Sequence, residues 1–451
     1  MKSFVKNNFK YIFLFIFFFC CLQFFFALLS GDQIYNYGFS YAISRGEIPY
    51  QDFNMIVPPV GAFLYAIPLK LFGVSLIIFN LFQALLLCVL FYFLFKLFGK
   101  KAYLLLIGLV VTIPIPIVTN LFQGYNFLLL LELVVLLYLE KSKANDYLIG
   151  IILGLAVFTK QTVGFCFCLV SIYYLFKDYK KVIKRLIGVL VPCFIFLIYF
   201  LGTKTLGNFL DMCLFGLFDF TTNNSSIGKV FSDFYFYVFL LEIGILIYQI
   251  VKDRKRLMYY YLLAYSVVAF PLFDYIHISY FTFPFLFIIL DKINVKEVSL
   301  GFPVCLWSVS FSVIWFLFMY DFKLPYIVNF DNFELFITSE TAEEENRYLK
   351  SFLNKYPNTI ILAENTYFTK ISMNLEINHY DLLNYGNHGY NGTNKLINRL
   401  VKEKNKYILV NMESYNTQRD RQQTNKEVMK YVIDNYEKKG VLGDYDVFYK
   451  E

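Results

Sequence analysis

The sequence predicts a polytopic α-helical membrane protein with a small α/β domain at its carboxyl end. Of its 451 residues, 58% are hydrophobic and only 17% are charged, whereas about a quarter of the residues in a soluble domain are charged. Apolar runs of membrane-crossing length recur through residues 1–320, and a polar, mixed-charge segment follows at 321–451. This composition excludes a soluble enzyme, because no water-soluble core could enclose so much apolar surface.

The net charge of +7 is unevenly distributed along the chain. Residues 1–320 hold 24 Lys/Arg and 15 Asp/Glu, while residues 321–451 hold 17 and 19. Basic residues beside membrane spans report orientation in the bilayer. We therefore expect the lipid bilayer, and not nucleic acid, to be the partner of the basic residues.

Roughly eleven transmembrane helices are predicted. The first, at 11–29, follows the basic residues Lys2, Lys6 and Lys10, and it is too long for the apolar core of an ordinary cleaved signal peptide. The other expected spans lie at 74–95, 102–118, 122–139, 147–158, 163–176, 186–201, 234–250, 257–270, 278–290 and 300–319.

Basic residues concentrate in every second connection between these spans. The basic set comprises Lys96/Lys100/Lys101, Lys141/Lys143, Lys177 to Arg185, Lys252 to Arg256, and Lys292/Lys296. The positive-inside rule then predicts a multi-pass protein of the cell membrane, with a cytoplasmic amino terminus and an extracytoplasmic carboxyl-terminal domain.

The segment 321–451 carries alternating helix and strand signals. Capping boxes at Thr341/Glu344 and Thr424/Glu427 predict helices at 342–355 and 425–436, the second closed by Gly440. A third helix is expected around 396–401, and strands at 359–363, 407–410 and 445–449. These signals predict a small α/β domain, with no glycine-rich phosphate loop or nucleophile motif of its own.

The first external loop holds the most informative polar residues. Asp32 follows the first span directly, at the edge of the hydrocarbon, where a low dielectric raises the pKa of a carboxyl group and suits it to act as a base. The alternative is that Asp32 caps a helix starting near Gln33. Helical spacing over 35–45, a turn at 46–52, Val57-Pro58-Pro59 and an amphipathic helix at 61–72 complete the loop.

This loop, at residues 31–73, resembles the first loop of the polyprenol-dependent GT-C glycosyltransferases. It is most similar to glycosyltransferase family 39, which includes protein O-mannosyltransferases and lipid A aminoarabinose transferase. The segments 158–162 (Phe-Thr-Lys-Gln-Thr) and 271–277 (Pro-Leu-Phe-Asp-Tyr-Ile-His) extend the resemblance. It implies transfer of a sugar from a polyprenyl-phosphate donor to a glycan, lipid or protein hydroxyl on the extracytoplasmic side, by a single inverting displacement.

The resemblance also implies residue roles. Asp32 would be the catalytic base, and Lys160 and His277 would hold the donor phosphate. Further candidate substrate-binding residues are Arg45, Glu47, Tyr50, Asp52, Gln161 and Asp274, with Tyr35 and Phe39 as candidate lining residues. Gln33 stands where many relatives carry a second acid, so the sequence gives little support to a divalent cation and predicts no other cofactor.

Alternatives remain for several residues and for the function. Lys160 interrupts two short apolar runs and either binds substrate or extends to the membrane surface. His277 is either a phosphate ligand or a structural histidine. We expect Glu132 and Glu242 to bond neighbouring helices, and His379 and His388 to be turn residues. A transporter or flippase for lipid-linked saccharides, or a polymer ligase, is the alternative function.

Overall fold

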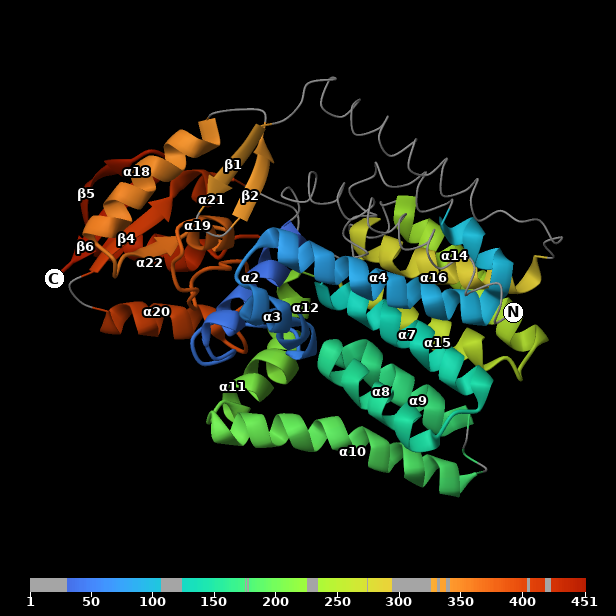
Figure 1. Cartoon of the computed structure of the whole chain (residues 1–451). Helices are drawn as coiled ribbons and strands as arrows, with labels where there is room; N and C mark the ends of the chain where they lie inside the picture. Colours follow the sequence, from blue (N-terminus) through green and yellow to red (C-terminus); the bar gives the residue numbers. More distant parts are fainter. Residues whose placement is uncertain are drawn as a thin grey trace.

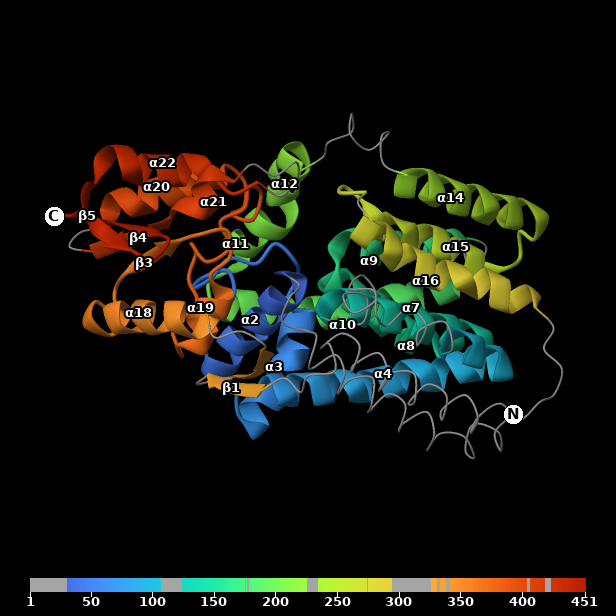
Figure 2. The same cartoon turned by 90° about the horizontal axis from the view of Figure 1, so that it is seen from above.

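The computed structural model describes residues 31–106, 124–174, 176, 178–224, 234–273, 275–293, 326–330, 333–337, 341–403, 406–417 and 423–451; for 31–33, 223–224, 275 and 326–347 it describes the backbone alone. A bundle of apolar helices forms one part, and an α/β domain at the carboxyl end lies at one end of the bundle (Figure 1). Residues 31–72 and 206–224 lie between the two parts (Figure 2).

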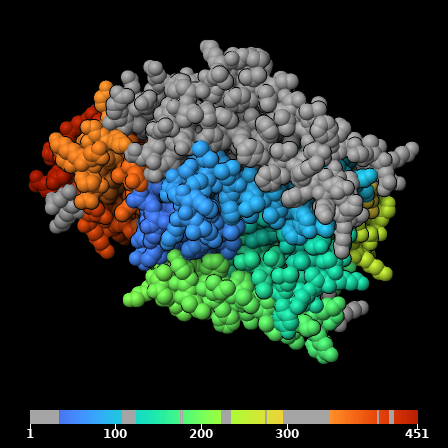
Figure 3. Space-filling model, viewed as in Figure 1, coloured from blue at the N-terminus to red at the C-terminus, as the bar shows by residue number. Residues whose placement is uncertain are grey.

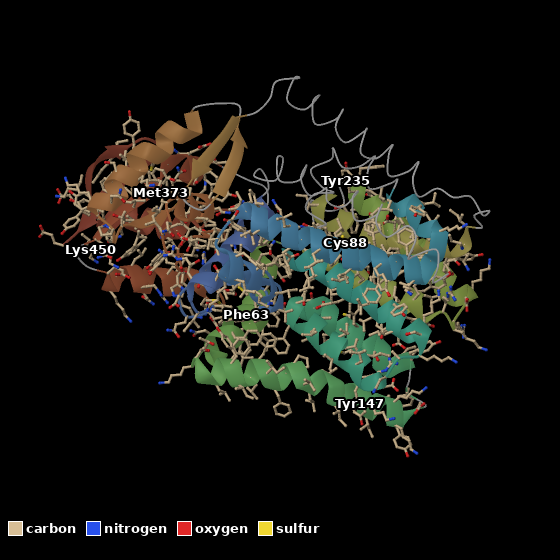
Figure 4. All side chains as sticks on the ribbon, in the orientation of Figure 1. Phe63, Cys88, Tyr147, Tyr235, Met373 and Lys450 are labelled. Carbon is tan, nitrogen blue, oxygen red and sulfur yellow. The ribbon has the colours of Figure 1, made fainter. Side chains whose placement is uncertain are left out.

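Two helices of the first loop join the bundle to the C-terminal domain. Helix α2 (Gly31–Arg45) and helix α3 (Val60–Phe72) confirm the predicted helices at 35–45 and 61–72. In the space-filling view their blue residues lie directly against the orange and red C-terminal domain (Figure 3). Ring contacts continue into the bundle, as between Phe63 of α3 and Tyr199, whose centroids are 5.1 Å apart (Figure 4).

The bundle is built around one almost completely buried helix. This is α7 (Gly124–Ser142), whose buried face runs nearly all around the helix. The other helices of the bundle are α4 (Leu76–Phe98) with η2 (Gly99–Lys101), α8 (Asp146–Thr159), α9 (Gln161–Tyr174), α10 (Tyr179–Gly202), α14 (Phe234–Lys252), α15 (Leu257–Tyr265) with η4 (Ser266–Ala269), and α16 (Tyr275–Lys292). A helix that is apolar on all sides belongs at the centre of such a bundle.

Three stretches of the described residues are long and apolar enough to cross a membrane: Leu76–Leu106, Tyr179–Gly202 and Phe234–Lys252. The shorter apolar helices are Val60–Phe72, Asp146–Thr159, Gln161–Tyr174 and Leu257–Ala269. The predicted spans at 11–29 and 300–319, and most of the span at 102–118, lie outside the described residues. The protein is thus mostly helical with candidate membrane spans, and the count of eleven stays a prediction.

Helices α8 and α9 form a tight hairpin, and both are shorter than the three stretches that are long enough to cross a membrane. A Cβ atom at Gly164 of α9 would lie 2.3 Å from the backbone of Ala156 in α8, so only glycine allows this approach. Tyr147, near the start of α8, lies at the end of the bundle remote from Met373 and Lys450 of the C-terminal domain (Figure 4). Lys160 therefore occupies the tip of the hairpin, at the end that faces the C-terminal domain.

Basic residues from separate connections come together at the remote end of the bundle. Lys101, Lys141, Lys255 and Arg256 line one cavity there together with Asp291. Nearby, the buried Arg185 donates to both Glu140 and Asp146, the latter at 2.9 Å. The basic connections, which the sequence predicts on one side of the membrane, thus lie at one end of the bundle.

The C-terminal domain is a small α/β unit. Its four-stranded sheet has the order β3 (Ile360–Leu362), β4 (Lys406–Asn411), β6 (Tyr445–Lys450), β5 (Glu437–Leu442); β3 and β4 are parallel and the other neighbours antiparallel. Helices α20 (Gly392–Lys402) and α22 (Lys426–Asn435) cover one face, and α18 (Thr341–Lys355) covers the other. A separate hairpin pairs β1 (Tyr326–Phe330) with β2 (Phe333–Ile337).

The structure confirms the three predicted strands and three predicted helices of this domain but corrects two of their boundaries. The side chain that caps α22 belongs to Asn425, which accepts the N–H of Val428, and not to Thr424. The prediction that Gly440 closes this helix was wrong, because α22 ends at Asn435 and Gly440 lies within β5. The short helices α19 (Tyr367–Ser372) and α21 (Met412–Asn416) were not predicted.

Candidate functional site

Two adjoining cavities lie where the bundle, the first loop and the C-terminal domain meet. They measure about 90 and 120 Å³ and share Ile56, Val57, Tyr125, Phe220, Leu272 and His277 as lining residues. We call the pair the junction cavity. Its walls come from segments that are more than two hundred residues apart in the sequence. The cavity therefore forms only in the folded protein.

Lys160 lines the junction cavity because the chain breaks between α8 and α9. Its backbone is extended (φ −149°, ψ 103°), and its N–H donates to the carbonyl of Ala156, which closes α8. The ammonium donates to the carbonyl of Val268 at 3.4 Å and lies 5.7 Å from the ring centroid of Tyr125. The hairpin tip thus holds a cation at the cavity wall.

Three helices begin at the junction cavity. Tyr125, Gln161 and His277 stand in the first turns of α7, α9 and α16, and each lines the cavity. Helix N-termini carry a partial positive charge and unpaired N–H groups, which favour an anion such as phosphate. Lys160 adds the positive charge of its side chain to these three helix ends.

Gln161 fixes the position of α9 in this wall. Its side-chain amide donates to the carbonyl of Cys213 at 2.8 Å and to that of Ile56 at 3.4 Å. Cys213 belongs to a π-helical segment (η3, Asp211–Phe215) between α11 (Leu206–Leu210) and α12 (Gly216–Asn224), and α12 carries Phe220 of the cavity. Gln161 therefore ties three wall segments to one another.

The side chains of Asp32 and Asp274 lie outside the described residues. Asp32 stands in the first turn of α2, three positions before Tyr35. Positions three apart share one face of a helix, and Tyr35 and Phe39 both line the junction cavity. The backbone of Asp32 is therefore one helical turn from a cavity-lining residue.

Tyr50 does not line the junction cavity but packs behind one of its lining residues, Val57. It is fully buried, its hydroxyl donates to the carbonyl of Val57 at 2.9 Å, and its ring contacts Phe200 and Phe209. Its φ of 70° lies in the left-handed region that side chains other than glycine rarely adopt. Tyr50 thus fixes the loop that carries Ile56 and Val57 to the cavity.

Arg45, Glu47 and Asp52 line a different and larger cavity of about 930 Å³, which we call the domain cleft. Arg45 donates to the carbonyl of Asn374, and its Nε lies 3.8 Å from Glu47 Oε1. Asp52 accepts the N–H of Ile48 at 2.6 Å and so closes the turn of the loop. The structure therefore separates these three candidates from Lys160 and His277.

Glu47 is the most perturbed acid of the domain cleft. Burial raises its pKa to about 7, against the opposing effects of the hydrogen bond from the N–H of Ile377 and of the Arg45 charge. A carboxyl group with a pKa near neutrality exchanges protons at physiological pH. Glu47 thus contacts the C-terminal domain through the N–H of Ile377, and its pKa lies near 7.

Asn54, His379 and His388 form a buried cluster that sequence analysis did not identify. The amide oxygen of Asn54 lies 2.7 Å from Nδ1 of His379, and its nitrogen lies 3.1 Å from Nδ1 of His388 and donates to the carbonyl of His379 at 2.9 Å. Burial lowers the pKa of His379 to about 4 and that of His388 to about 3. Both histidines lie in turns, as predicted, and their side chains also bind Asn54 of the first loop.

The segment between the two histidines forms the wall of the junction cavity on the side of the C-terminal domain. Asn384, Tyr385 and Asn387 line the cavity. A Cβ atom at Gly386 (φ 89°) would lie 2.6 Å from the backbone of Phe220 in α12. Only glycine permits this approach, which brings the C-terminal domain over the cavity.

The buried acids of the bundle bond neighbouring helices, as predicted. Thr159 donates to Glu132 at 2.8 Å and Thr282 donates to Glu242 at 3.3 Å. Within the part of the chain that the structure describes, no three His, Cys, Asp or Glu side chains come together as metal ligands.

The comparison with protein families identifies a glycosyltransferase family. Residues 56–272 match the model of Glycosyltransferase family 87. No curated protein matches the chain. The match begins at Ile56 and ends at Leu272, both of which line the junction cavity, and it includes Lys160 and Gln161.

This match indicates a glycosyltransferase that works within a membrane. It supports the predicted class of enzyme, but the match is to family 87 and not to family 39, which the sequence of the first loop had led us to expect. Asp32 and His277 lie outside the matched residues. Their roles therefore depend on the arguments that follow.

Proposed function

We propose that the chain is an integral-membrane glycosyltransferase of the GT-C type that takes a sugar from a polyprenyl-phosphate donor. In this proposal the junction cavity holds the phosphate and the sugar, and Asp32 is the general base. The observation that carries the proposal is the convergence of Lys160, His277 and three helix N-termini on one cavity, and the family match includes Lys160.

The donor class follows from the side of the membrane on which the cavity lies. The positive-inside rule supports a cytoplasmic location for the remote end with its basic connections, and hence an extracytoplasmic location for the junction cavity. Nucleotide sugars are normally absent from that side, so an activated sugar must arrive attached to a lipid. The apolar wall formed by Tyr35, Phe39 and Leu272 suits the first isoprene units of such a carrier.

The reaction needs one proton acceptor. Asp32 takes the proton of the acceptor hydroxyl while that oxygen attacks the anomeric carbon, and the bond from this carbon to the phosphate oxygen breaks. The polyprenyl phosphate leaves with the bonding electrons and needs charge stabilisation, not a general acid. Lys160, His277 and the N-termini of α7, α9 and α16 supply that stabilisation, and a single displacement inverts the anomeric configuration.

A transfer assay on the full-length protein in liposomes tests the donor class. Membranes from cells that lack this protein supply the acceptors, and synthetic polyprenyl-phosphate sugars are compared with the corresponding nucleotide sugars. We expect transfer from the lipid-linked donors alone, with inversion visible in the NMR spectrum of the product.

Two outcomes would contradict the proposal. Transfer from nucleotide sugars without a lipid-linked intermediate would refute the proposal that the donor is a polyprenyl-phosphate sugar. Movement of an intact lipid-linked sugar across the liposome bilayer, with no glycosidic bond formed, would instead identify a flippase.

A further inference from the structure

A second cavity, at the remote end of the bundle, has no part in the proposed transfer. It measures about 480 Å³ and is lined by the C-terminal ends of α4, α7, α9 and α16, by η2 and by the turn into α15. Lys101, Lys141, Lys255 and Arg256 face Glu140 and Asp291 in this cavity, which we call the basic pocket.

The acids of the basic pocket are already paired. Both carboxylate oxygens of Glu140 accept from Arg185, and Tyr261 donates to Glu140 at 3.1 Å. Asp291 pairs with Arg256 and accepts from Tyr259 at 3.1 Å. Within the part of the chain that the structure describes, Lys101, Lys141 and Lys255 have no carboxylate partner within ion-pair distance.

Two of these lysines bind backbone carbonyls at the C-terminal ends of helices. Lys141 donates to the carbonyl of Leu97 at 2.5 Å and Lys101 to that of Asp291 at 3.5 Å, which satisfies carbonyls at the C-terminal ends of α4 and α16. An ammonium group has three protons, so each of these lysines retains donors. Lys255 is exposed, and its side chain makes no hydrogen bond to any residue within the described ranges.

Apolar side chains share the basic pocket with these cations. They are Leu97, Phe98, Leu137, Leu257, Met258 and Leu290. A site for a free inorganic anion needs no such lining, whereas the glycerol and first methylene groups of a phospholipid fit against it. Basic pockets between transmembrane helices on the cytoplasmic side are known to bind lipid phosphates.

We infer that the basic pocket binds the phosphate headgroup of an anionic membrane lipid. The phosphate would accept from Lys255, Lys101 and Lys141, and the glycerol end of the acyl chains would lie against Leu257 and Leu290. This inference depends on the membrane location of the bundle but not on the proposed donor or on Asp32. Lipid composition would then influence the stability of the enzyme from the end opposite to the transfer site.

Native mass spectrometry of the full-length protein in detergent tests the inference. Phosphatidylglycerol and phosphatidylcholine with identical acyl chains are added in equal amounts, and inorganic phosphate is added in a parallel sample. We expect preferential retention of phosphatidylglycerol. Lys255→Gln should lower its retention about fivefold and Lys101→Gln/Lys255→Gln about 25-fold, whereas Lys255→Arg should retain it.

Lys252→Gln is the matched control. Lys252 is an exposed lysine near the same end of the bundle, over the ring of Tyr248 and outside the basic pocket. This variant should keep the retention of the wild type. Equal retention of the two lipids, equal retention by Lys255→Gln and the wild type, or displacement of phosphatidylglycerol by equimolar inorganic phosphate would each overturn the inference.

Discussion

Each end of the bundle has a cavity that we propose binds a phosphate group, but the two cavities provide positive charge by different means. At the junction cavity, α7, α9 and α16 begin, and the only lysine that lines this cavity within the described residues is Lys160. At the basic pocket the same three helices end, and four cations line the cavity. One set of helices thus presents its N-terminal ends to one cavity and its C-terminal ends to the other.

The difference shows how helix direction sets the requirement for side-chain charge. Helix N-termini attract an anion by themselves, whereas C-termini repel it until lysines and arginines outweigh the carbonyl charge. A single lysine at the hairpin tip therefore has a larger effect at the junction cavity than any one of the four cations at the remote end. The predictions below test this contrast.

Replacement of Lys160 is expected to have the largest effect on donor binding. Lys160→Met removes the only lysine ammonium that lines the junction cavity among the residues that the structure describes. Loss of a hydrogen bond to a charged group weakens binding by about 1.5 to 3 kcal/mol. Binding of a polyprenyl-phosphate sugar should fall about 10- to 100-fold in an equilibrium binding assay.

Lys70→Met is the control for this change. Lys70 is an exposed lysine in the last turn of α3, outside both the junction cavity and the domain cleft. The control should bind the donor like the wild type. Unchanged donor affinity in Lys160→Met would remove Lys160 from the phosphate site.

Loss of Asn54 should loosen the contact that brings the C-terminal domain to the junction cavity. Asn54→Ala leaves His379 and His388 without their buried partner, which costs about 1 to 3 kcal/mol. We expect a lower thermal midpoint and faster tryptic release of the C-terminal domain. Asn354→Ala, on the exposed side of α18, should change neither, and equal stability of the two variants would refute the role of the cluster.

The sequence alone predicted the local elements well. Apolar runs correctly placed α4, α10 and α14, and the helical spacing after Asp32 correctly placed α2. The break at Lys160 was also readable, because two runs of about a dozen residues are each short for a span. Such features depend on neighbours in the chain, so the sequence contains them directly.

The sequence could not predict which loop residues meet. Arg45, Glu47 and Asp52 are close in sequence to Ile56 and Val57, yet they line the domain cleft and not the junction cavity. The pairing of Asn54 with His379 joins residues 325 positions apart. The repeated Asn-His pairs at 378–379 and 387–388 were visible, but their partner depends on tertiary packing, which one sequence does not reveal.

A pH dependence of the stability is expected to arise at Glu47. Its pKa is raised to about 7 in the folded protein, so the folded state binds this proton more tightly than the unfolded state does. The stabilisation that this tighter proton binding gives the folded state is fully present below about pH 4.5. It is lost as the pH rises toward 7. Glu47→Gln should therefore gain thermal stability relative to the wild type between pH 4.5 and 7, and a constant difference would contradict the assignment.

Turnover of an Asp32→Asn variant tests the central claim most directly. The full-length protein is supplied with a synthetic polyprenyl-phosphate sugar, and both sugar transfer and donor binding are measured, with Asp178→Asn at the remote cap of α10 as the control. The account predicts a fall in turnover of about a hundredfold to ten thousandfold, with donor affinity and the control unchanged. Transfer by Asp32→Asn at the wild-type rate would contradict the account.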